Sequence, residues 1–232
     1  IKIKGKNKNI RKVIMEKEKQ LKFITIEGGD GAGKSTFIPF IKDYLEGMGE
    51  EVVLTREPGG TALGERLRDL LLSHKMDLNA ETLLMFAARA QHMSQVIEPA
   101  LQAGKWVLCD RFTDSTYAYQ CAAKGFPESS LKQLETIVQG DTRPGLTFVF
   151  DVPLAVSKER LARTGKVPDK FESEDDAFKE RVNKGYKNLV KKHINRCKLI
   201  DSSQSIEATK EQVLLHLDEF FLGFKKKKQM KP

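Results

Sequence analysis

Short apolar runs alternate with longer segments of helical periodicity between about residues 22 and 222. Five runs are apolar and partly β-branched, as buried strands are: 22–26, 51–55, 106–110, 147–151 and 197–201. Apolar residues recur at helical spacing over 37–48, 63–71, 80–103, 131–138, 153–163 and 206–221. Because strands and helices alternate, the pattern predicts an α/β fold, a three-layer sandwich with a five-stranded parallel sheet and helices on both faces.

A glycine-rich octapeptide lies between the first predicted strand and the first predicted helix. Residues 28–35, Gly-Gly-Asp-Gly-Ala-Gly-Lys-Ser, match the phosphate-binding loop G-x-x-x-x-G-K-[ST] of P-loop NTPases. In such a loop the backbone N–H groups face a polyphosphate, Lys34 reaches the β- and γ-phosphates, and the Ser35 hydroxyl ligates Mg²⁺. A chance glycine-rich turn would not explain the flanking strand and helix. The expected ATP contacts are Gly28, Gly29, Asp30, Gly31, Ala32, Gly33, Lys34, Ser35 and Thr36.

The net charge of +8 is concentrated at the two ends of the chain. Residues 1–22 hold nine Lys/Arg and two Glu, and residues 225–232 hold five Lys, so residues 23–224 carry a net charge of −4. We expect a basic, disordered extension over residues 1–21, one domain over 22–222 and a basic, disordered tail over 223–232. The acidic body argues against specific nucleic-acid binding, and weak contact of the tails with polyanions is the alternative.

The apolar runs and the cysteines also indicate where in the cell the protein is located. No apolar run approaches the ~18 residues of a membrane span, and the first residues lack the apolar core of a secretion signal. The three cysteines, Cys109, Cys121 and Cys197, have neither metal-ligand spacing nor the pattern of a disulfide framework. These features predict a cytoplasmic protein without a membrane partner.

Arginines follow the predicted strands at the edge where open α/β sheets bind ligands. Arg56 follows the second strand, and the third ends in Asp110 and Arg111. An apolar strand that ends in Asp resembles the second nucleotide-site motif of phosphate-loop enzymes, in which the carboxylate supports Mg²⁺. Guanidinium pairs with phosphate through two hydrogen bonds, and a phosphate acceptor is already ionised near neutral pH. These residues therefore favour a nucleoside monophosphate as the acceptor of a phosphoryl group.

Two further segments suit the nucleoside part of such an acceptor. Phe86 and Arg89 share a helix face and could hold a planar base, although the spacing alone favours a core Phe beside a surface Arg. Residues 113–120 are rich in small polar groups and tyrosines, which suits hydrogen bonds to a nucleoside.

Basic residues crowd a Gly- and Pro-containing segment at about 160–172, namely Arg160, Arg163, Lys166 and Lys170. After the fourth strand of a phosphate-loop protein, such a segment predicts a mobile basic lid, with a solvated loop as the alternative. Asp151 ends the fourth strand and could be a second metal carboxylate. Pro153 favours a helix cap or structural acid instead, because proline commonly opens a helix.

Five motifs, in order, resemble bacterial thymidylate kinases. They are the octapeptide, Thr-Arg-Glu-Pro-Gly-Gly-Thr at 55–61, Phe-Ala-Ala-Arg-Ala-Gln-His at 86–92, Asp-Arg-Phe at 110–112 and Thr-Tyr-Ala-Tyr-Gln at 116–120. The resemblance covers about residues 22–222, and the second and fourth motifs together are far more discriminating than the octapeptide alone. It implies a homodimer that transfers the γ-phosphoryl group of ATP to dTMP with Mg²⁺, for dTTP synthesis.

The resemblance also implies roles for single residues. Catalytic roles fall to Lys34, Asp110, Arg111, Arg163 and Lys170, and the metal ligands are Ser35 and Asp110. The implied acceptor contacts are Asp30 near the 3′-hydroxyl, Arg56 and Arg111 on the phosphate, Phe86 stacked on thymine, Arg89 at its edge, Thr116 and Gln120 on the base, and Tyr119 under the deoxyribose.

One feature of the bacterial type and two departures from the family pattern affect these expectations. Gly31 stands where some eukaryotic members have an arginine, so the lid must supply the transition-state charge through Arg163, Lys166 or Lys170. The lid has Lys170 where arginine is usual, and lysine lacks the bidentate fork. Residues 121–125, Cys-Ala-Ala-Lys-Gly, replace a glycine-rich turn, which should stiffen it.

Two other functions remain as alternatives. A deoxynucleoside kinase would need a carboxylate base at the acceptor hydroxyl, and Glu57 is the well-placed candidate. A non-catalytic nucleotide-binding module would not need the intact set of Lys34, Ser35 and Asp110.

Overall fold

The computed structural model describes residues 21–229, with side chains of the last helix described up to Gly223. The extension expected at 1–21 therefore lies outside the described residues, apart from Leu21. One parallel sheet has the strand order β2-β3-β1-β4-β5. Its strands are β1 (Phe23–Gly28), β2 (Val52–Arg56), β3 (Trp106–Asp110), β4 (Leu146–Asp151) and β5 (Cys197–Asp201). Each lies within two residues of a predicted strand, so the predicted α/β architecture is confirmed.

Helical segments connect and follow these strands. They are α2 (Lys34–Gly47), α3 (Ala62–Ser73), α4 (Leu78–His92), η1 (Met93–Ile97), α5 (Glu98–Gln102), α6 (Thr113–Thr116), η2 (Tyr117–Ala123), α7 (Glu128–Gln139), α8 (Leu154–Arg163), α9 (Asp176–Lys192) and α10 (Ile206–Gln229). The segments η1 and η2 are π-helical.

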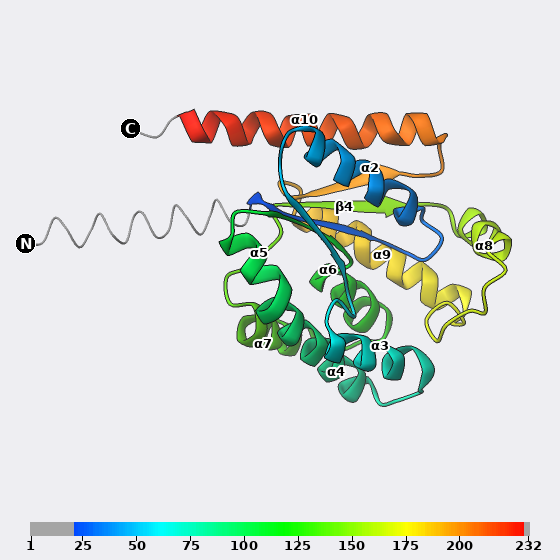
Figure 1. Cartoon of the computed structure of the whole chain (residues 1–232). Helices are drawn as coiled ribbons and strands as arrows, with labels where there is room; N and C mark the ends of the chain where they lie inside the picture. Colours follow the sequence, from blue (N-terminus) through cyan, green and yellow to red (C-terminus); the bar gives the residue numbers. More distant parts are fainter. Residues whose placement is uncertain (1–20, 230–232) are drawn as a thin grey trace, which may run out of the picture.

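The helices cover both faces of the sheet, as Figure 1 shows. On one face α2 and α10 pack apolar side chains such as Ile41 and Leu217 against the strands. On the other face η1 contributes Met93 to one core cluster, and α9 contributes Val182 to another. All six residues of β1 are buried, because a central parallel strand is covered on both sides.

The helices predicted over 80–103 and 206–221 differ in extent from those in the structure. The stretch predicted as one helix over 80–103 is divided into α4, η1 and α5, because a π-helical turn interrupts the regular period. The closing helix, predicted to end at 221, continues to Gln229. The helical backbone therefore passes the tail boundary expected at 223 and includes the lysine run at 225–228, since lysine is a good helix former; residues 230–232 of the expected tail lie outside the described residues.

The carboxyl ends of three neighbouring strands form one edge of the sheet. The strand register pairs Arg56 of β2 with Asp110 of β3, and Asp110 with Ile26 of β1, just before the phosphate-binding loop. Thr61 caps α3 at this edge by accepting a 2.9 Å hydrogen bond from the Gly64 N–H. None of the helices within residues 21–229 combines the length and apolar character that a membrane crossing needs.

Candidate active site

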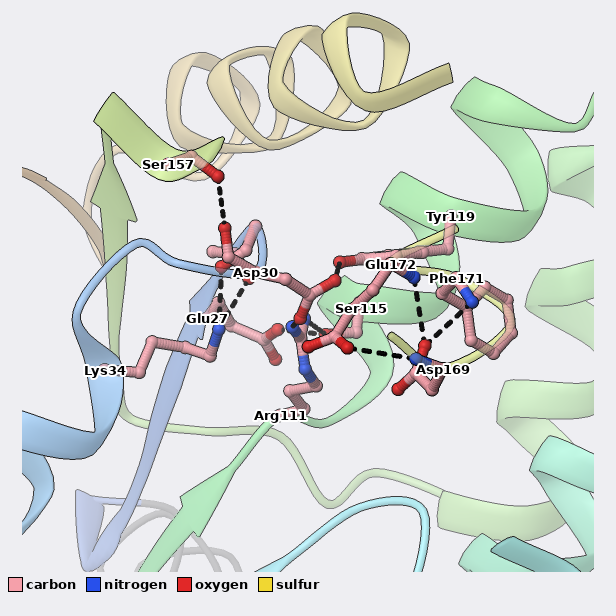
Figure 2. Close-up of polar contacts among 12 residues, drawn as sticks. Glu27, Asp30, Lys34, Arg111, Ser115, Tyr119, Ser157, Asp169, Phe171 and Glu172 are labelled. Atoms are coloured by element: carbon pink, nitrogen blue, oxygen red, sulfur yellow. Dashed lines mark hydrogen bonds and ion pairs between the residues drawn. The ribbon is translucent and has the colours of Figure 1, made fainter. Parts of the chain in front are cut away.

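Glycines allow the phosphate-binding loop to lie close to the rest of the fold. Gly28 and Gly31 have φ angles of +135° and +72°, which side-chain-bearing residues rarely adopt. A Cβ on Gly28 would lie 2.4 Å from the Phe150 carbonyl oxygen, and one on Gly31 would lie 2.6 Å from that of Ser157. Ser157 also donates a 2.6 Å hydrogen bond to the Asp30 carbonyl (Figure 2). The loop is thus held at the N-terminus of α2, where the helix dipole favours an anion.

Lys34 lies buried at the start of α2. Its Nζ donates to the carbonyls of Gly28 at 3.0 Å and Gly29 at 2.8 Å. Burial lowers the pKa of Lys34 to about 8. Ser35 and Thr36 follow with exposed side chains. The loop therefore presents one desolvated ammonium and two accessible hydroxyls.

Asp110 has the features of a metal carboxylate. Its Oδ1 is buried and has no hydrogen-bond partner in the described part of the chain. A buried carboxylate oxygen without a partner is costly unless a ligand satisfies it. Together with the Ser35 hydroxyl it supplies oxygen donors, which Mg²⁺ prefers, and Mg²⁺ usually takes only one or two protein ligands beside phosphate and water. The residues present therefore fit the implied ion.

Arg111 lies between the loop and the rest of the site. Its backbone is left-handed, with φ 69°, and its Nη2 pairs with Asp30 Oδ1 at 2.5 Å. Its Nη1 donates to Ser115 Oγ at 3.3 Å and to Tyr186 Oη at 3.1 Å. The Tyr119 hydroxyl donates to the other Asp30 oxygen at 3.1 Å (Figure 2). Although burial opposes it, the Arg111 guanidinium holds the pKa of Asp30 below its usual range.

Glu27 lies within this network, near the end of β1, and is completely buried. Its carboxyl oxygens accept hydrogen bonds from the Phe112 N–H at 2.7 Å, the Ser115 hydroxyl at 2.5 Å and the Tyr186 hydroxyl at 3.2 Å. Burial, and then the negative charge of Asp114, raise the pKa of Glu27 to about 8. Glu27 is therefore mostly neutral at pH 7.

A pocket with about 640 Å³ of empty volume, open solvent at its mouth included, opens beside Arg111. We call it the acceptor pocket. Six of the eight residues that the sequence assigned to the acceptor line it: Asp30, Arg89, Arg111, Thr116, Tyr119 and Gln120. Arg56 and Phe86 are not among the described residues that line it.

Arg89 is the most enclosed cation of the acceptor pocket, with 2% of its side chain exposed. Its Nε pairs with Glu57 at 2.7 Å and its Nη2 donates to Thr116 at 3.0 Å. Its Nη1 is buried and has no partner among the described residues, which leaves one donor for a ligand. The guanidinium lies 4.8 Å from the centre of the buried Phe86 ring. The helix spacing thus indicated a core Phe correctly, but the adjacent Arg is buried as well.

His92 of α4 contacts both Thr55 of β2 and Glu57, the first residue after that strand. Its Nδ1 lies 2.9 Å from a Glu57 oxygen and its Nε2 lies 2.6 Å from Thr55 Oγ1. A Cβ on Gly60 would lie 2.6 Å from Nε2, so glycine allows the turn to close over the imidazole. One buried network therefore connects the turn, α4 and Arg89.

One arginine lies away from its expected place, and another, not predicted, lines the acceptor pocket. Arg56 ends β2 at the predicted edge, but its side chain is 52% exposed and pairs with Glu65 at 2.7 Å. Arg68 of α3 lines the acceptor pocket and donates to the Pro58 carbonyl at 2.9 Å. Arg68 could not be recognised from the sequence, because nothing in its helix pattern separates it from a surface arginine.

The predicted lid begins in the last turn of α8 and reaches the acceptor pocket. Asp169 and Phe171 line that pocket, and the Phe171 ring meets Tyr119 edge-on at 5.7 Å. Lys170 pairs at 2.5 Å with the buried carboxylate of Glu81 on α4. Arg163 is 74% exposed and pairs with Glu159 one helical turn earlier. The structure therefore brings the lid to the acceptor pocket and leaves Arg163 on the surface.

Arg160 is the lid cation that contacts the phosphate-binding loop. Its Nη1 lies 3.5 Å from the Gly31 carbonyl and its Nη2 donates to the Ser202 carbonyl at 2.8 Å. A second pocket, of about 450 Å³ with open solvent included, is lined by Arg160, Ser202, Gly33 and Thr36. The loop thus separates two pockets, as a donor and an acceptor require.

Comparison with known proteins agrees with this geometry. The family model described as "Thymidylate kinase" matches residues 26–213. A thymidylate kinase of Methylobacillus flagellatus is 50% identical over 199 residues, which cover 86% of this chain and 98% of that protein. One of Bordetella petrii is 48% identical over 192 residues, 83% of this chain and 92% of that protein. The crystal structure of thymidylate kinase from Ehrlichia chaffeensis has a TM-score of 0.70 and 36% identity, and the match covers 84% of this chain and 97% of that one. The chain belongs to the thymidylate kinase family.

Proposed function

We propose that this protein transfers the γ-phosphoryl group of ATP to dTMP and so forms dTDP. The observation that carries the proposal is the position of Arg111, which lies between the phosphate-binding loop and a pocket lined by Arg89, Thr116 and Gln120. A cation at that place can hold an anionic acceptor against the loop that holds the donor. Family membership and the high coverage of the relatives support the same reaction.

The donor phosphates would bind at the loop. Lys34, now bonded to two carbonyls of the loop, would turn its ammonium to the β- and γ-phosphates. Ser35 and Asp110 would hold Mg²⁺, which neutralises charge on the transferring group. The nucleoside part of ATP would lie in the second pocket, beside Arg160.

The acceptor phosphate would replace Asp30 as the partner of Arg111. Guanidinium binds phosphate bidentately, and the phosphate oxygen that attacks is already ionised, so no general base is needed. Asp30 and Tyr119 would then lie beside the deoxyribose. Of the lid cations, Arg163 and Lys170 remain proposed sources of transition-state charge, and each must leave its present carboxylate partner to act.

The base would lie against Arg89, Thr116 and Gln120 at the inner end of the acceptor pocket. Phe86 would support it from beneath Arg89. We further infer a cytoplasmic protein, from the cysteine pattern, and a homodimer, from the family resemblance; sedimentation of the purified protein tests the homodimer.

A rival deoxynucleoside kinase function is disfavoured by the surroundings of Glu57. That carboxylate is buried and already paired with Arg89 and His92, so it is not available to accept a proton from a sugar hydroxyl.

Release of ADP with Mg-ATP tests the proposal directly. The acceptors would be dTMP, dUMP, thymidine, AMP and none. We expect strong turnover with dTMP and little with thymidine or AMP. Turnover with thymidine but not dTMP would refute the assignment of Arg111 to an acceptor phosphate.

A further inference from the structure

Glu81 is a buried carboxylate that the proposed reaction does not use. It lies in the first turn of α4 and is 1% exposed. Its Oε1 accepts from Gln120 Nε2 at 3.0 Å and from Lys124 at 2.8 Å. Its Oε2 accepts from Lys124 at 2.9 Å and from Lys170 at 2.5 Å. The Glu81 carboxylate therefore contacts the Gln120 amide in the acceptor pocket, the turn after η2 and the lid.

The surroundings keep this carboxyl ionised. Burial alone would raise the pKa of Glu81, but the hydrogen bonds from Lys124, Lys170 and Gln120 hold it below its usual range. An ionised carboxylate has acceptors and no donor. Gln120 must therefore turn its NH₂ group to Glu81, and its carbonyl oxygen, Oε1, is left for the acceptor pocket that Gln120 lines.

Arg89 supplies the complementary group in the same pocket. Its Nη1 is buried, has no partner among the described residues, and can only donate. The pocket thus offers one fixed donor and one fixed acceptor. Thymine and uracil present an acceptor at O4 beside a donor at N3–H, which match the pair. Cytosine presents a donor at N4 beside an acceptor at N3, which opposes both.

We propose that Glu81 is a positioning residue that sets base specificity: it fixes the amide of Gln120 so that the pocket accepts a 4-oxo pyrimidine and rejects a 4-amino pyrimidine. This inference rests on the proposed function, because it assumes that the nucleotide base occupies this pocket. The preference for thymine comes mainly from the unfavourable binding of cytosine. A mismatched base leaves a buried donor facing a donor and a buried acceptor facing an acceptor.

The test compares dTMP with dCMP as acceptors for the wild type and two variants. Glu81→Gln keeps the shape of the side chain but offers both a donor and an acceptor, so the Gln120 amide can turn either way. Lys124→Met removes a neighbouring cation and leaves the Glu81 carboxylate and its bond to Gln120 in place. The readout is the ratio of kcat/KM for dTMP to kcat/KM for dCMP.

We expect Glu81→Gln to lower that ratio by about 10- to 100-fold, which is the range of one or two matched hydrogen bonds. Lys124→Met should change it by less than about threefold. An unchanged ratio in Glu81→Gln, or an equal fall in Lys124→Met, would overturn the proposal, because it would assign the effect to the lysines or to the lid. If the wild type does not phosphorylate dTMP at all, the proposed function fails instead.

A structure of the wild-type complex with dTMP tests the same point without a variant, should Glu81→Gln fold poorly. We expect Gln120 Oε1 within hydrogen-bond distance of N3 and Nε2 still on Glu81. Contact of Nε2 with the base, instead of with Glu81, would overturn the proposal.

Discussion

Because the folded protein holds a proton on Glu27, we predict that its free energy of unfolding depends on pH. The perturbation is Glu27→Gln. A glutamine has the shape and hydrogen-bonding pattern of a protonated glutamic acid: its carbonyl can accept from the Phe112 N–H, and its amide can donate to Ser115 or Tyr186, whose hydroxyls also accept. The variant is therefore a permanent copy of the protonated state.

The size of the effect follows from the displaced pKa. Burial raises the pKa of Glu27 from 4.5 to about 8, so between these values the folded protein keeps a proton that the unfolded chain has lost. Each pH unit in that interval lowers the free energy of unfolding by about 1.4 kcal/mol, and the whole interval by up to about 5 kcal/mol. The contribution of the proton is fully present below pH 4.5 and is lost as pH rises through 8.

Urea denaturation of the wild type and Glu27→Gln at pH 5, 6, 7, 8 and 9 measures this contribution. We expect the variant to gain stability relative to the wild type by several kcal/mol between pH 5 and pH 9. Glu211→Gln, at an exposed position on α10, is the control and should follow the wild type at every pH. A constant difference between wild type and Glu27→Gln across this range would refute the reasoning, because the folded protein would then bind no extra proton at Glu27.

Three further predictions concern the site. Arg111→Lys keeps the charge but loses the fork, so kcat/KM for dTMP should fall about 100-fold while KM for ATP stays within about threefold; steady-state kinetics in both substrates test this, and an effect confined to ATP would contradict it. His92→Asn can keep the bond to Glu57, whereas His92→Gln reaches toward Thr55, so we expect Asn to retain dTMP affinity better than Gln by titration calorimetry; the reverse order would mean that the Thr55 contact matters more. Lys170→Arg should leave kcat within about twofold or raise it, since arginine can also rest on Glu81 and adds the bidentate fork that lysine lacks; a tenfold loss in stopped-flow turnover would assign the lysine another task.

Local sequence patterns were sufficient to predict the sheet and the phosphate-binding loop. The strands are apolar runs of five or six residues bounded by turns. The glycines of the octapeptide are required by its backbone, as the close approach of Phe150 to Gly28 shows. The division of the 80–103 stretch was not predictable in the same way, because the π-helical turn at η1 changes the period without any proline or glycine inside it to mark it.

The candidate site was predicted less completely, because its polar partners are far apart in the sequence. Glu81 meets Gln120 and Lys170 across 39 and 89 positions, and no local periodicity encodes such pairs. Arg56 was expected to face the ligand from its place at a strand end, yet its side chain turns to Glu65 on the following helix. Sequence position indicated the correct edge of the sheet, whereas side-chain direction depended on tertiary neighbours.

The carboxylates of this site divide its cations into two kinds. Arg89 pairs with Glu57, and both side chains are almost completely buried, so that pair costs too much desolvation to separate once formed. Arg111 pairs with Asp30, but those side chains are 17% and 27% exposed, which makes the Asp30 carboxylate replaceable by a phosphate of higher charge. Recognition of the base would therefore use groups that are fixed before binding, while recognition of the phosphate would use an exchange of one anion for another. This arrangement places the rigid contacts where bases must be distinguished and the exchangeable contact beside the group that reacts.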